Sequence, residues 1–237
     1  MNEQYKYPGD ELILFENATH WKTYFSRIIR PYIKGTVLEA GAGIGGTTTL
    51  LNDGSAPKWV LLEPDASLSK TLQQKIDAKA FPPNTILRTG NIDNIAEKYD
   101  TILYIDVIEH IESDKMEIQK AFSRLNAGGH IIILSPAFPT LYSPFDKTIG
   151  HHRRYTKKMT SELSPAGLSL VHNRYYDSAG FFASLMNKLL FRQQYPTLKQ
   201  VLFWDRWLIP VSTFLDKITM HSFGKSIISI WKKPILK

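Results

Sequence analysis

The chain has no cysteine among its 237 residues, and this absence excludes several kinds of site at once. Without thiols there is no disulfide framework, no thiolate metal centre and no cysteine nucleophile. Long hydrophobic runs are missing too, because Asn187 and Lys188 interrupt one apolar stretch and Pro210 interrupts another. No run reaches the roughly 18 apolar residues that a membrane-spanning helix needs. We therefore do not expect the protein to cross a membrane, although it could lie on one.

The start of the chain lacks the pattern of a signal peptide. Its first residues, MNEQYKYPGDE, include acids and a proline where a signal peptide has a basic start and an apolar run. We expect no export and a cytoplasmic protein, with peripheral membrane contact as a further option. The net charge of +7 favours an anionic partner or surface without naming one. At 43% hydrophobic residues the chain can fill one sizeable core, which predicts a single domain.

The first two thirds of the chain alternate between strand-like and helix-like patterns. Residues 11–34 have apolar positions at helical spacing and are predicted to form one helix, with Pro31 and Gly35 marking its end. Polar helical stretches such as 66–79 and 114–125 separate short apolar runs, and this alternation predicts a parallel sheet with helices on both faces. The predicted strands are residues 36–40, 58–63, 84–89, 99–105 and 130–135.

The last third departs from this alternation. Strand-like segments at 168–176 and 225–233 enclose an apolar, aromatic and helical insert at 177–224. One interpretation is a helical subdomain that packs against the sheet. The other is a lid or a membrane-surface patch over residues 178–222, because the aromatic side chains are mixed with Lys and Arg.

The stretch VLEAGAGIGG carries glycines in G-x-G-x-x-G spacing at Gly41, Gly43 and Gly46, between a predicted strand and a helix. The spacing alone fits several nucleotide-binding families. Glu39 narrows the choice, because a carboxylate just before the loop would repel a pyrophosphate and would instead attract a cation. Glu63 ends the next strand, where a carboxylate can bind both hydroxyls of a ribose. S-adenosylmethionine carries a cation at one end and an adenosine ribose at the other.

Five motifs in this order resemble those of the class I S-adenosylmethionine-dependent methyltransferases. They are VLEAGAGIGG, LLEPD, GNIDNI, YDTILYIDVIEHI and LNAGGHIIILSPAF. The stretches SPFDKTIGHHRRYT and SIISIWKKP further resemble a bacterial small-molecule subgroup. The resemblance implies a Rossmann-like α/β fold. The expected fold has a mostly parallel seven-stranded sheet with an antiparallel last strand, helices on both faces and a helical insert before the last strand.

The resemblance also implies roles for residues at the cofactor end. The methionine part would contact Glu39, Gly41, Ala42 and Gly43; the ribose would contact Glu63 and Pro64; and the adenine would contact Asn91, Ile92 and Asp93. Asp106 would stand near the methyl donor or the substrate. Alternatives remain open, since Glu39 could cap a helix or pair with a lysine, and Asp93 could cap the short helix that follows it.

The acceptor is expected to bind beyond the fourth and fifth strands. Residues 135–158 form a long, basic segment that could be a solvated surface or a substrate loop. In the second reading His151 and His152 are candidate general bases, and the substrate-binding candidates are Glu109, His110, Tyr142, Arg153, Arg154 and Tyr155. Glu109 and His110 could equally stabilise the turn before the helix at 114.

The predicted function is methyl transfer from S-adenosylmethionine, with S-adenosylhomocysteine as product, to an oxygen or nitrogen of a small polar or anionic acceptor. No metal is expected, and the oligomeric state is left open. In this reading residues 1–35 form an entrance segment, 36–135 bind the cofactor, 136–176 hold the substrate loop and 225–237 the last strand.

Three alternative functions remain open. A nucleic-acid methyltransferase fits the net charge, but the segment IDVIEH lacks the Asp or Asn, two prolines and aromatic residue typical of amino methylation of bases. A noncatalytic cofactor-binding protein would bind the donor without turnover. An NAD-linked oxidoreductase conflicts with the charge of Glu39.

Overall fold

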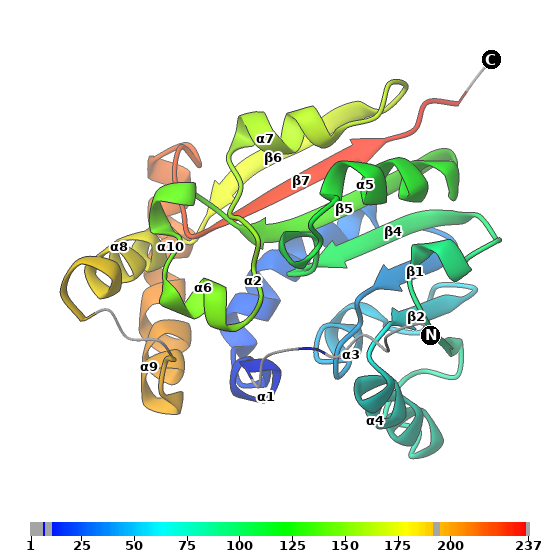
Figure 1. Cartoon of the computed structure of the whole chain (residues 1–237), viewed down its shortest axis with the longest axis horizontal. Helices are drawn as coiled ribbons and strands as arrows, with labels where there is room; N and C mark the ends of the chain where they lie inside the picture. The colour runs from blue at the N-terminus through cyan, green and yellow to red at the C-terminus, as the bar shows by residue number, and fades with distance from the viewer. Residues whose placement is uncertain (1–6, 8–10, 192–194, 236–237) are drawn as a thin grey trace.

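The computed structural model describes residues 7, 11–191 and 195–235. The described chain forms a seven-stranded sheet in the order β3-β2-β1-β4-β5-β7-β6 (Figure 1). The strands β1 to β5 are parallel, whereas β7 runs antiparallel to both of its neighbours, β5 and β6. The predicted fold class is therefore confirmed. The strands are β1 (Val37–Ala40), β2 (Trp59–Glu63), β3 (Thr85–Thr89), β4 (Tyr99–Ile105), β5 (Leu125–Pro136), β6 (Ser169–Tyr176) and β7 (Ser226–Lys232).

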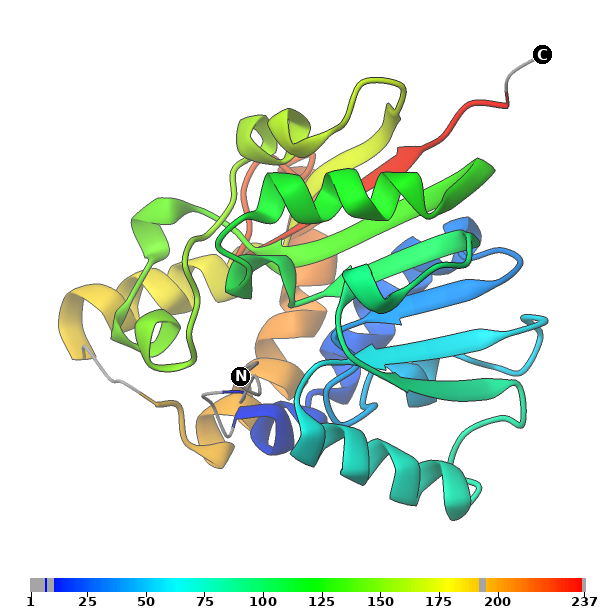
Figure 2. The ribbon, with the colours of Figure 1, turned by 45° about the vertical axis from the view of Figure 1, so that its right-hand side comes forward.

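Helices cover both faces of the sheet (Figure 2). Alternate strand residues point to opposite faces. Accordingly, Leu38 and Ile102 join the core under α5 and α7, while Val37 and Leu103 join the core under α2, α3, α4 and the insert. The helices are α1 (Glu11–Glu16), α2 (Thr19–Ile29), α3 (Thr48–Leu51), α4 (Ala66–Asp77), α5 (Asp114–Ser123), α6 (Pro144–Thr148), α7 (Lys157–Leu163), α8 (Ser178–Met186), α9 (Leu198–Phe203) and α10 (Ile209–Ile218), and the short turns include η2 (Ile92–Asn94) and η3 (Ile108–His110).

The prediction of one helix over 11–34 is wrong, because the segment divides into α1 and α2. The side-chain amide of Asn17 donates to the carbonyls of Ile13 and Leu14 at 3.3 Å each, which satisfies the end of α1. The next helix is capped from a distant part of the chain. Asp205 accepts hydrogen bonds from the backbone N–H groups of His20 and Trp21 at 3.0 and 2.8 Å.

The helical insert between β6 and β7 comprises α8, α9, α10 and two π-helical turns, η5 (Asn187–Phe191) and η6 (Trp204–Leu208). It packs beside α2 through buried Val201, Trp204 and Ile209 (Figure 1). Buried Asp216 on α10 joins this helix to the start of α8, directly after β6, by accepting hydrogen bonds from the N–H groups of Asp177 and Ser178, both at 2.9 Å. Within the described residues, no helix has the length and apolarity needed to cross a bilayer.

Candidate active site

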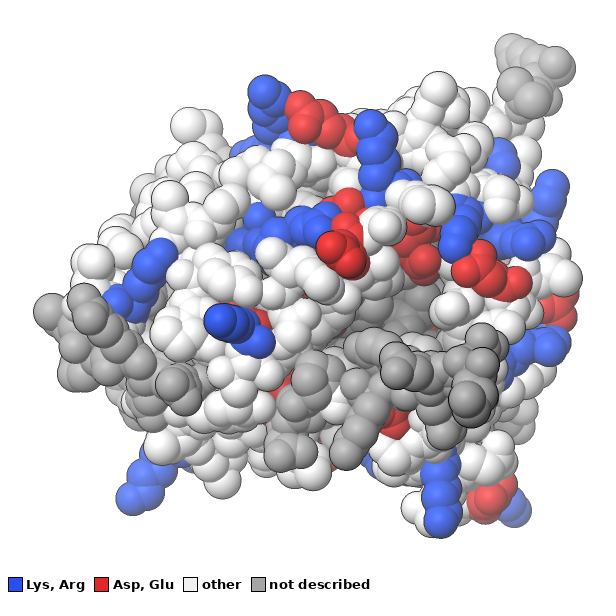
Figure 3. All heavy atoms as spheres, viewed as in Figure 1, with Lys and Arg blue, Asp and Glu red and all other residues white. Residues whose placement is uncertain are grey.

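A cavity of about 640 Å³ lies at the carboxyl ends of β1, β2, β4 and β5. Its volume is in the range of small-molecule binding sites. Figure 3 shows a recess near the centre of this face, with acidic side chains beside it. The cavity reaches from the glycine loop to the segment after β5. Its lining includes Glu39, Gly41, Ala42, Gly43, Glu63, Pro64, Asn91, Ile92, Asp106, Glu109, His110, His151, His152, Arg154, Trp204 and Lys225.

Three glycines of the loop, Gly41, Gly43 and Gly45, have left-handed backbone conformations, and the first two bring the backbone against the cavity. Gly41 has φ +69° and Gly43 has φ +58°, a region that side chains strongly disfavour. A Cβ atom at Gly41 would lie 2.7 Å from the side chain of Val107, whereas one at Gly43 would meet nothing closer than Leu12 at 3.5 Å. Of these two cavity-lining glycines, Gly41 thus excludes a side chain by contact, whereas Gly43 disfavours one by its backbone conformation alone.

Gly41→Ala is therefore expected to weaken donor binding far more than Gly43→Ala. At Gly41 the added methyl must displace Val107, which follows Asp106 at the end of β4, in addition to straining the backbone. Calorimetric titration with S-adenosylmethionine, the donor that the sequence resemblance implies, checks the order of the two affinities. Equal losses in the two variants would mean that the contact with Val107 has no influence on the loop.

Glu39 is a buried carboxylate at the end of β1. Its Oε2 accepts hydrogen bonds from the Thr48 hydroxyl at 2.9 Å and the Trp59 indole N–H at 2.8 Å. Among the described residues no donor reaches Oε1, and no lysine pairs with the side chain. Burial raises the pKa of Glu39 to about 7, against the opposing effect of these two donors. Neither alternative for Glu39, a helix cap or a lysine pair, is found.

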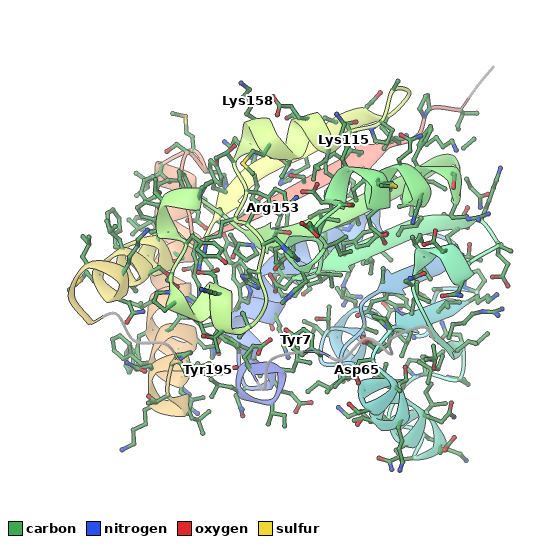
Figure 4. The ribbon with its side chains drawn as sticks, viewed as in Figure 1. Tyr7, Asp65, Lys115, Arg153, Lys158 and Tyr195 are labelled. Atoms are coloured by element: carbon green, nitrogen blue, oxygen red, sulfur yellow. The ribbon has the colours of Figure 1, made fainter. Side chains whose placement is uncertain are left out.

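Glu63 ends β2 on the neighbouring strand. Its carboxylate accepts hydrogen bonds from the N–H groups of Asp65 and Gly43 at 2.9 and 2.8 Å, so the glycine loop and this strand end hold each other in place. Burial raises the pKa of Glu63 to about 7. Asp65 caps α4 and also accepts from the N–H of Tyr7 at 2.7 Å (Figure 4).

The turn expected to flank the adenine lies partly in the cavity. Asn91 and Ile92 line it, and the Asn91 side chain caps η2. Asp93 is not in the lining, because its carboxylate lies 2.7 Å from Nζ of Lys120 on the protein surface. The structure therefore brings Asn91 and Ile92 to the site but directs Asp93 away from it.

Asp106 follows β4 with φ +54°, a strained conformation for a residue with a side chain. A hydrogen bond from its N–H to the carbonyl of Leu134, 2.8 Å long, holds the backbone there. The carboxylate is exposed to the cavity, and no hydrogen bond or ion pair links it to the described residues. Surrounding protein raises the pKa of Asp106 to about 6, although the charges of His151, Lys225 and Lys22 oppose the shift.

Buried Asp146 organises the loop after β5. Arg154 donates to its two oxygens through Nε at 2.8 Å and Nη2 at 3.0 Å, and His151 Nδ1 lies 2.9 Å from Oδ1. Burial would raise the pKa of Asp146, but these partners outweigh it and hold the pKa well below its usual range. Nη1 of Arg154 has no hydrogen-bond partner among the described residues.

Three residues predicted to bind the acceptor lie outside the cavity lining and brace the loop instead. The Tyr142 hydroxyl donates to the His151 carbonyl at 2.6 Å, and the Tyr155 hydroxyl donates to Asp114 at 2.8 Å. Arg153 also pairs with Asp114 and donates to the Glu112 carbonyl at 2.7 Å (Figure 4). Tyr155 and Arg153 are thus held at the start of α5 and Tyr142 within the loop, which explains why aromatic and basic residues here need not contact a ligand.

Lys225 is a cavity residue that the sequence analysis did not single out. It precedes β7, and its Nζ lies 4.1 Å from the centre of the Trp204 ring. Burial lowers the pKa of Lys225, while the charges of Asp177 and Asp106 oppose that change. No local motif marks this lysine, because only the antiparallel placement of β7 beside β5 brings it to the cavity.

Residues 15–189 match the model of a family described as "Methyltransferase domain". The chain belongs to this family. It is therefore an S-adenosylmethionine-dependent methyltransferase of class I, with the sheet order and antiparallel β7 described above.

Individual relatives are distant. Over 130 residues the enzyme is 27% identical to the ribosomal RNA small subunit methyltransferase C of Erwinia tasmaniensis, a match that covers 52% of this chain and 38% of that protein. A methyltransferase in complex with the Haloferax volcanii Trm112 activator shares the fold at a TM-score of 0.63, 12% identity and 95% coverage of both chains. Coclaurine N-methyltransferase, solved with N-methylheliamine and S-adenosylhomocysteine, has a TM-score of 0.60 at 14% identity, with 89% of this chain and 72% of that chain covered.

Proposed function

We propose that the enzyme methylates an oxygen or nitrogen of a small, polar or anionic acceptor. One observation carries the proposal: a single cavity has two chemically different ends, and it is also lined by the Asp106 carboxylate, which has no hydrogen-bond or ion-pair partner among the described residues. Glu39 and Glu63 mark one end, and Arg154 and the histidines mark the other. Residues 36–135 would bind the donor and 136–176 the acceptor.

At the donor end, the free oxygen of Glu39 would receive the ammonium group of S-adenosylmethionine. Glu63 would accept hydrogen bonds from the ribose hydroxyls, because each of its oxygens has a lone pair left after bonding one backbone N–H. Asn91 and Ile92 would flank the adenine. The backbone of the glycine loop would lie along the methionine part.

The chemical step needs alignment more than acid catalysis. A lone pair of the acceptor forms a bond to the methyl carbon while the carbon–sulfur bond breaks, and its electron pair stays on sulfur, which becomes neutral. The leaving group therefore requires no proton, so the main contribution of the enzyme is to hold donor and acceptor in contact. A hydroxyl acceptor must also lose its proton, for which His151 and His152 are the sequence-based candidates.

The cations at the other end favour an acceptor with negative charge. Nη1 of Arg154 is buried and has no hydrogen-bond partner within residues 7, 11–191 and 195–235, and Lys225 lines the same region with its charge only partly compensated. A carboxylate or phosphate on the acceptor would satisfy both groups, and a guanidinium suits planar oxygen pairs.

A screen with isotopically labelled methyl donor tests this proposal. Cell extract is incubated with the enzyme, and label is counted separately in the small-molecule, lipid and RNA fractions, with Asp106→Ala as the matched inactive control. We expect label in a small anionic molecule. Label confined to RNA would instead support the second candidate function, which the ribosomal RNA methyltransferase relative favours. Donor binding without labelling of any fraction would indicate a noncatalytic protein.

Donor binding is expected to weaken as the pH falls below 7. The pKa of Glu39 in the ligand-free protein is about 7, and only the ionised form attracts the ammonium group. The affinity should therefore drop by up to about tenfold per pH unit below 7 and level off above it, with Glu63 adding to the slope. Titration calorimetry in two buffers with different ionisation enthalpies at pH 7 should detect proton release. Proton uptake would contradict this account.

The insert also carries an apolar stripe that we propose binds an anionic membrane surface. Phe203, Trp207, Val211, Phe214 and Ile218 recur every three or four residues along α9, η6 and α10, and Trp207 and Phe214 are 68% and 66% exposed. The insert's two acids in this stretch, Asp205 and Asp216, are buried. Lys199, Arg206 and Lys217 are exposed beside the stripe. Exposed apolar and basic side chains together suit an anionic bilayer surface.

The double variant Trp207→Ser/Phe214→Ser is expected to lose most of its sedimentation with vesicles that contain anionic lipid. Both side chains are mainly exposed, so the change should leave folding intact. Met116→Ser is the matched control, because Met116 is 58% exposed on α5, on the opposite face of the sheet. Retention of binding by the double variant, or no binding by the wild type, would remove the stripe as a membrane contact.

A further inference from the structure

Three potential metal ligands converge where the cavity meets the loop after β5. Glu109, His110 and His151 each offer one ligand atom, and these atoms lie within 4.8 Å of one another. Oε1 of Glu109 is 3.8 Å from Nε2 of His151, and the two imidazole rings are 4.6 Å apart between centres. All three residues line the cavity.

Two of the atoms in this cluster are buried and have no hydrogen-bond partner in the described part of the chain. Among the described residues, neither Oε1 of Glu109 nor Nδ1 of His110 has a hydrogen bond. Glu109 is completely buried, and only its other oxygen is bonded, to the Ser135 hydroxyl at 3.1 Å. A separation of 3.8 Å is too long for a hydrogen bond between His151 and Glu109. An unpartnered buried carboxylate oxygen is costly, so the cluster is incomplete without a further group.

Both imidazoles are oriented as metal-binding histidines usually are. Nδ1 of His151 is engaged by Asp146, which leaves the lone pair of Nε2 directed toward Glu109. Such a carboxylate on the second ring nitrogen fixes the tautomer of a ligating histidine. His110 bonds the backbone of Gly150, and its Nδ1 has no hydrogen-bond partner in the part of the chain that the structure describes. This nitrogen is therefore available as a ligand atom.

We propose that Glu109, His110 and His151 bind one divalent transition-metal ion. Two imidazoles and one carboxylate suit Mn²⁺, Fe²⁺, Co²⁺ or Zn²⁺ better than Mg²⁺ or Ca²⁺. Ligands at about 2.0–2.2 Å from one ion stand about 3–3.5 Å apart, so small side-chain rotations close the observed spacing. This proposal revises the expectation that the protein has no metal, and it replaces the role of His151 as a general base.

The surrounding charges are compatible with a dication. Asp106 adds a second carboxylate close enough to influence Glu109, and Arg154 is largely balanced by its ion pair with Asp146. Lys225 is a nearby cation that would remain to oppose the metal or to bind an anionic acceptor. Three protein ligands leave coordination positions open for an oxygen of the acceptor beside the methyl donor. This last role rests on the proposed function, whereas metal binding itself does not.

Titration of the full-length protein with metal alone tests the site. After EDTA treatment and removal of the chelator, Mn²⁺, Co²⁺, Zn²⁺ and Mg²⁺ are added separately in a calorimeter, and Co²⁺ binding is also followed by visible absorption. We expect one ion per chain, with at least one transition metal bound more tightly than Mg²⁺. Glu109→Gln and His151→Ala should each lower the affinity by about a hundredfold, and Asp146→Asn by about ten- to a hundredfold.

His152→Ala is the matched control, since it removes the adjacent imidazole and should keep the metal affinity of the wild type. The affinity of each chelated variant for S-adenosylmethionine reports whether it has folded and whether the donor site is intact. Donor binding without saturable metal binding would overturn this inference and leave the proposed methyl transfer standing. Equal metal affinity in the wild type and in Glu109→Gln would overturn it as well.

Discussion

Glu39→Gln is expected to weaken the binding of S-adenosylmethionine by about a hundredfold, because a neutral amide replaces the buried partner of the ligand's ammonium group. The amide can still meet the Thr48 hydroxyl and the Trp59 indole N–H through its oxygen. The shape of the site and its polar contacts are thus retained, and the loss of charge is the main change.

The stability of the ligand-free protein should move in the opposite direction. The folded-state pKa of Glu39 is raised to about 7 from an ordinary value of 4.5, so the folded protein binds this proton more tightly than the unfolded chain. Ionised Glu39 therefore destabilises the fold as the pH rises from 4.5 to 7, and glutamine removes that cost. Thermal unfolding at pH 8 should show an unchanged or higher Tm for the variant.

Calorimetric titration measures the affinity, and Glu97→Gln is the control, because Glu97 is an exposed carboxylate that pairs with Lys58 and Arg88. A Glu39→Gln protein that binds the donor normally would falsify the assignment of Glu39 to the ammonium group. A large drop in Tm would show that Glu39 is mainly a structural residue.

Asp146→Ala is expected to lower the free energy of unfolding by about 3–5 kcal/mol, the usual cost of leaving one member of a buried ion pair uncompensated. Arg154 would keep its buried charge without an acceptor, and His151 would lose the partner that orients its ring. Urea denaturation at pH 7 gives the measurement. Ser143→Ala is the control, since it removes one donor to Asp146 at the start of α6 and should cost about 1 kcal/mol.

Acid should reduce the difference between the wild type and Asp146→Ala. The pKa of Asp146 is depressed in the folded protein, so its contribution to stability is complete above the ordinary pKa and is lost as the pH falls toward the folded-state value. The two proteins should therefore approach each other in stability at strongly acidic pH. A constant difference down to low pH would argue that packing, and not charge, accounts for the loss.

The donor half of the site is more predictable from sequence than the acceptor half. Glu39 and Glu63 end adjacent strands, and residues at the carboxyl ends of parallel strands must meet at one edge of the sheet. Their position follows from strand periodicity and from the glycine loop between them. Asp106 directly follows β4, the strand on the other side of β1, and therefore meets the same edge of the sheet.

The loop after β5 has no such periodicity to fix its side chains. Arg153 and Arg154 are adjacent in sequence, yet one pairs with Asp114 at the start of α5 and the other with Asp146 inside the loop. No sequence motif marks Asp146, because its hydrogen bonds and ion pairs form only in the folded loop. The break between α1 and α2 is similar, since a cap supplied by distant Asp205 cannot be read from local spacing.

The hydrogen bonds around Asp146 have a consequence for how an acceptor is recognised. The carboxylate accepts from Ser143, His151 and Arg154, so the two ends of the loop are joined before any ligand arrives. Little conformational entropy then remains to be lost when the acceptor binds. Selectivity at this end should therefore come from a preorganised shape, and poorly fitting molecules should be rejected at the encounter instead of being accommodated by loop rearrangement.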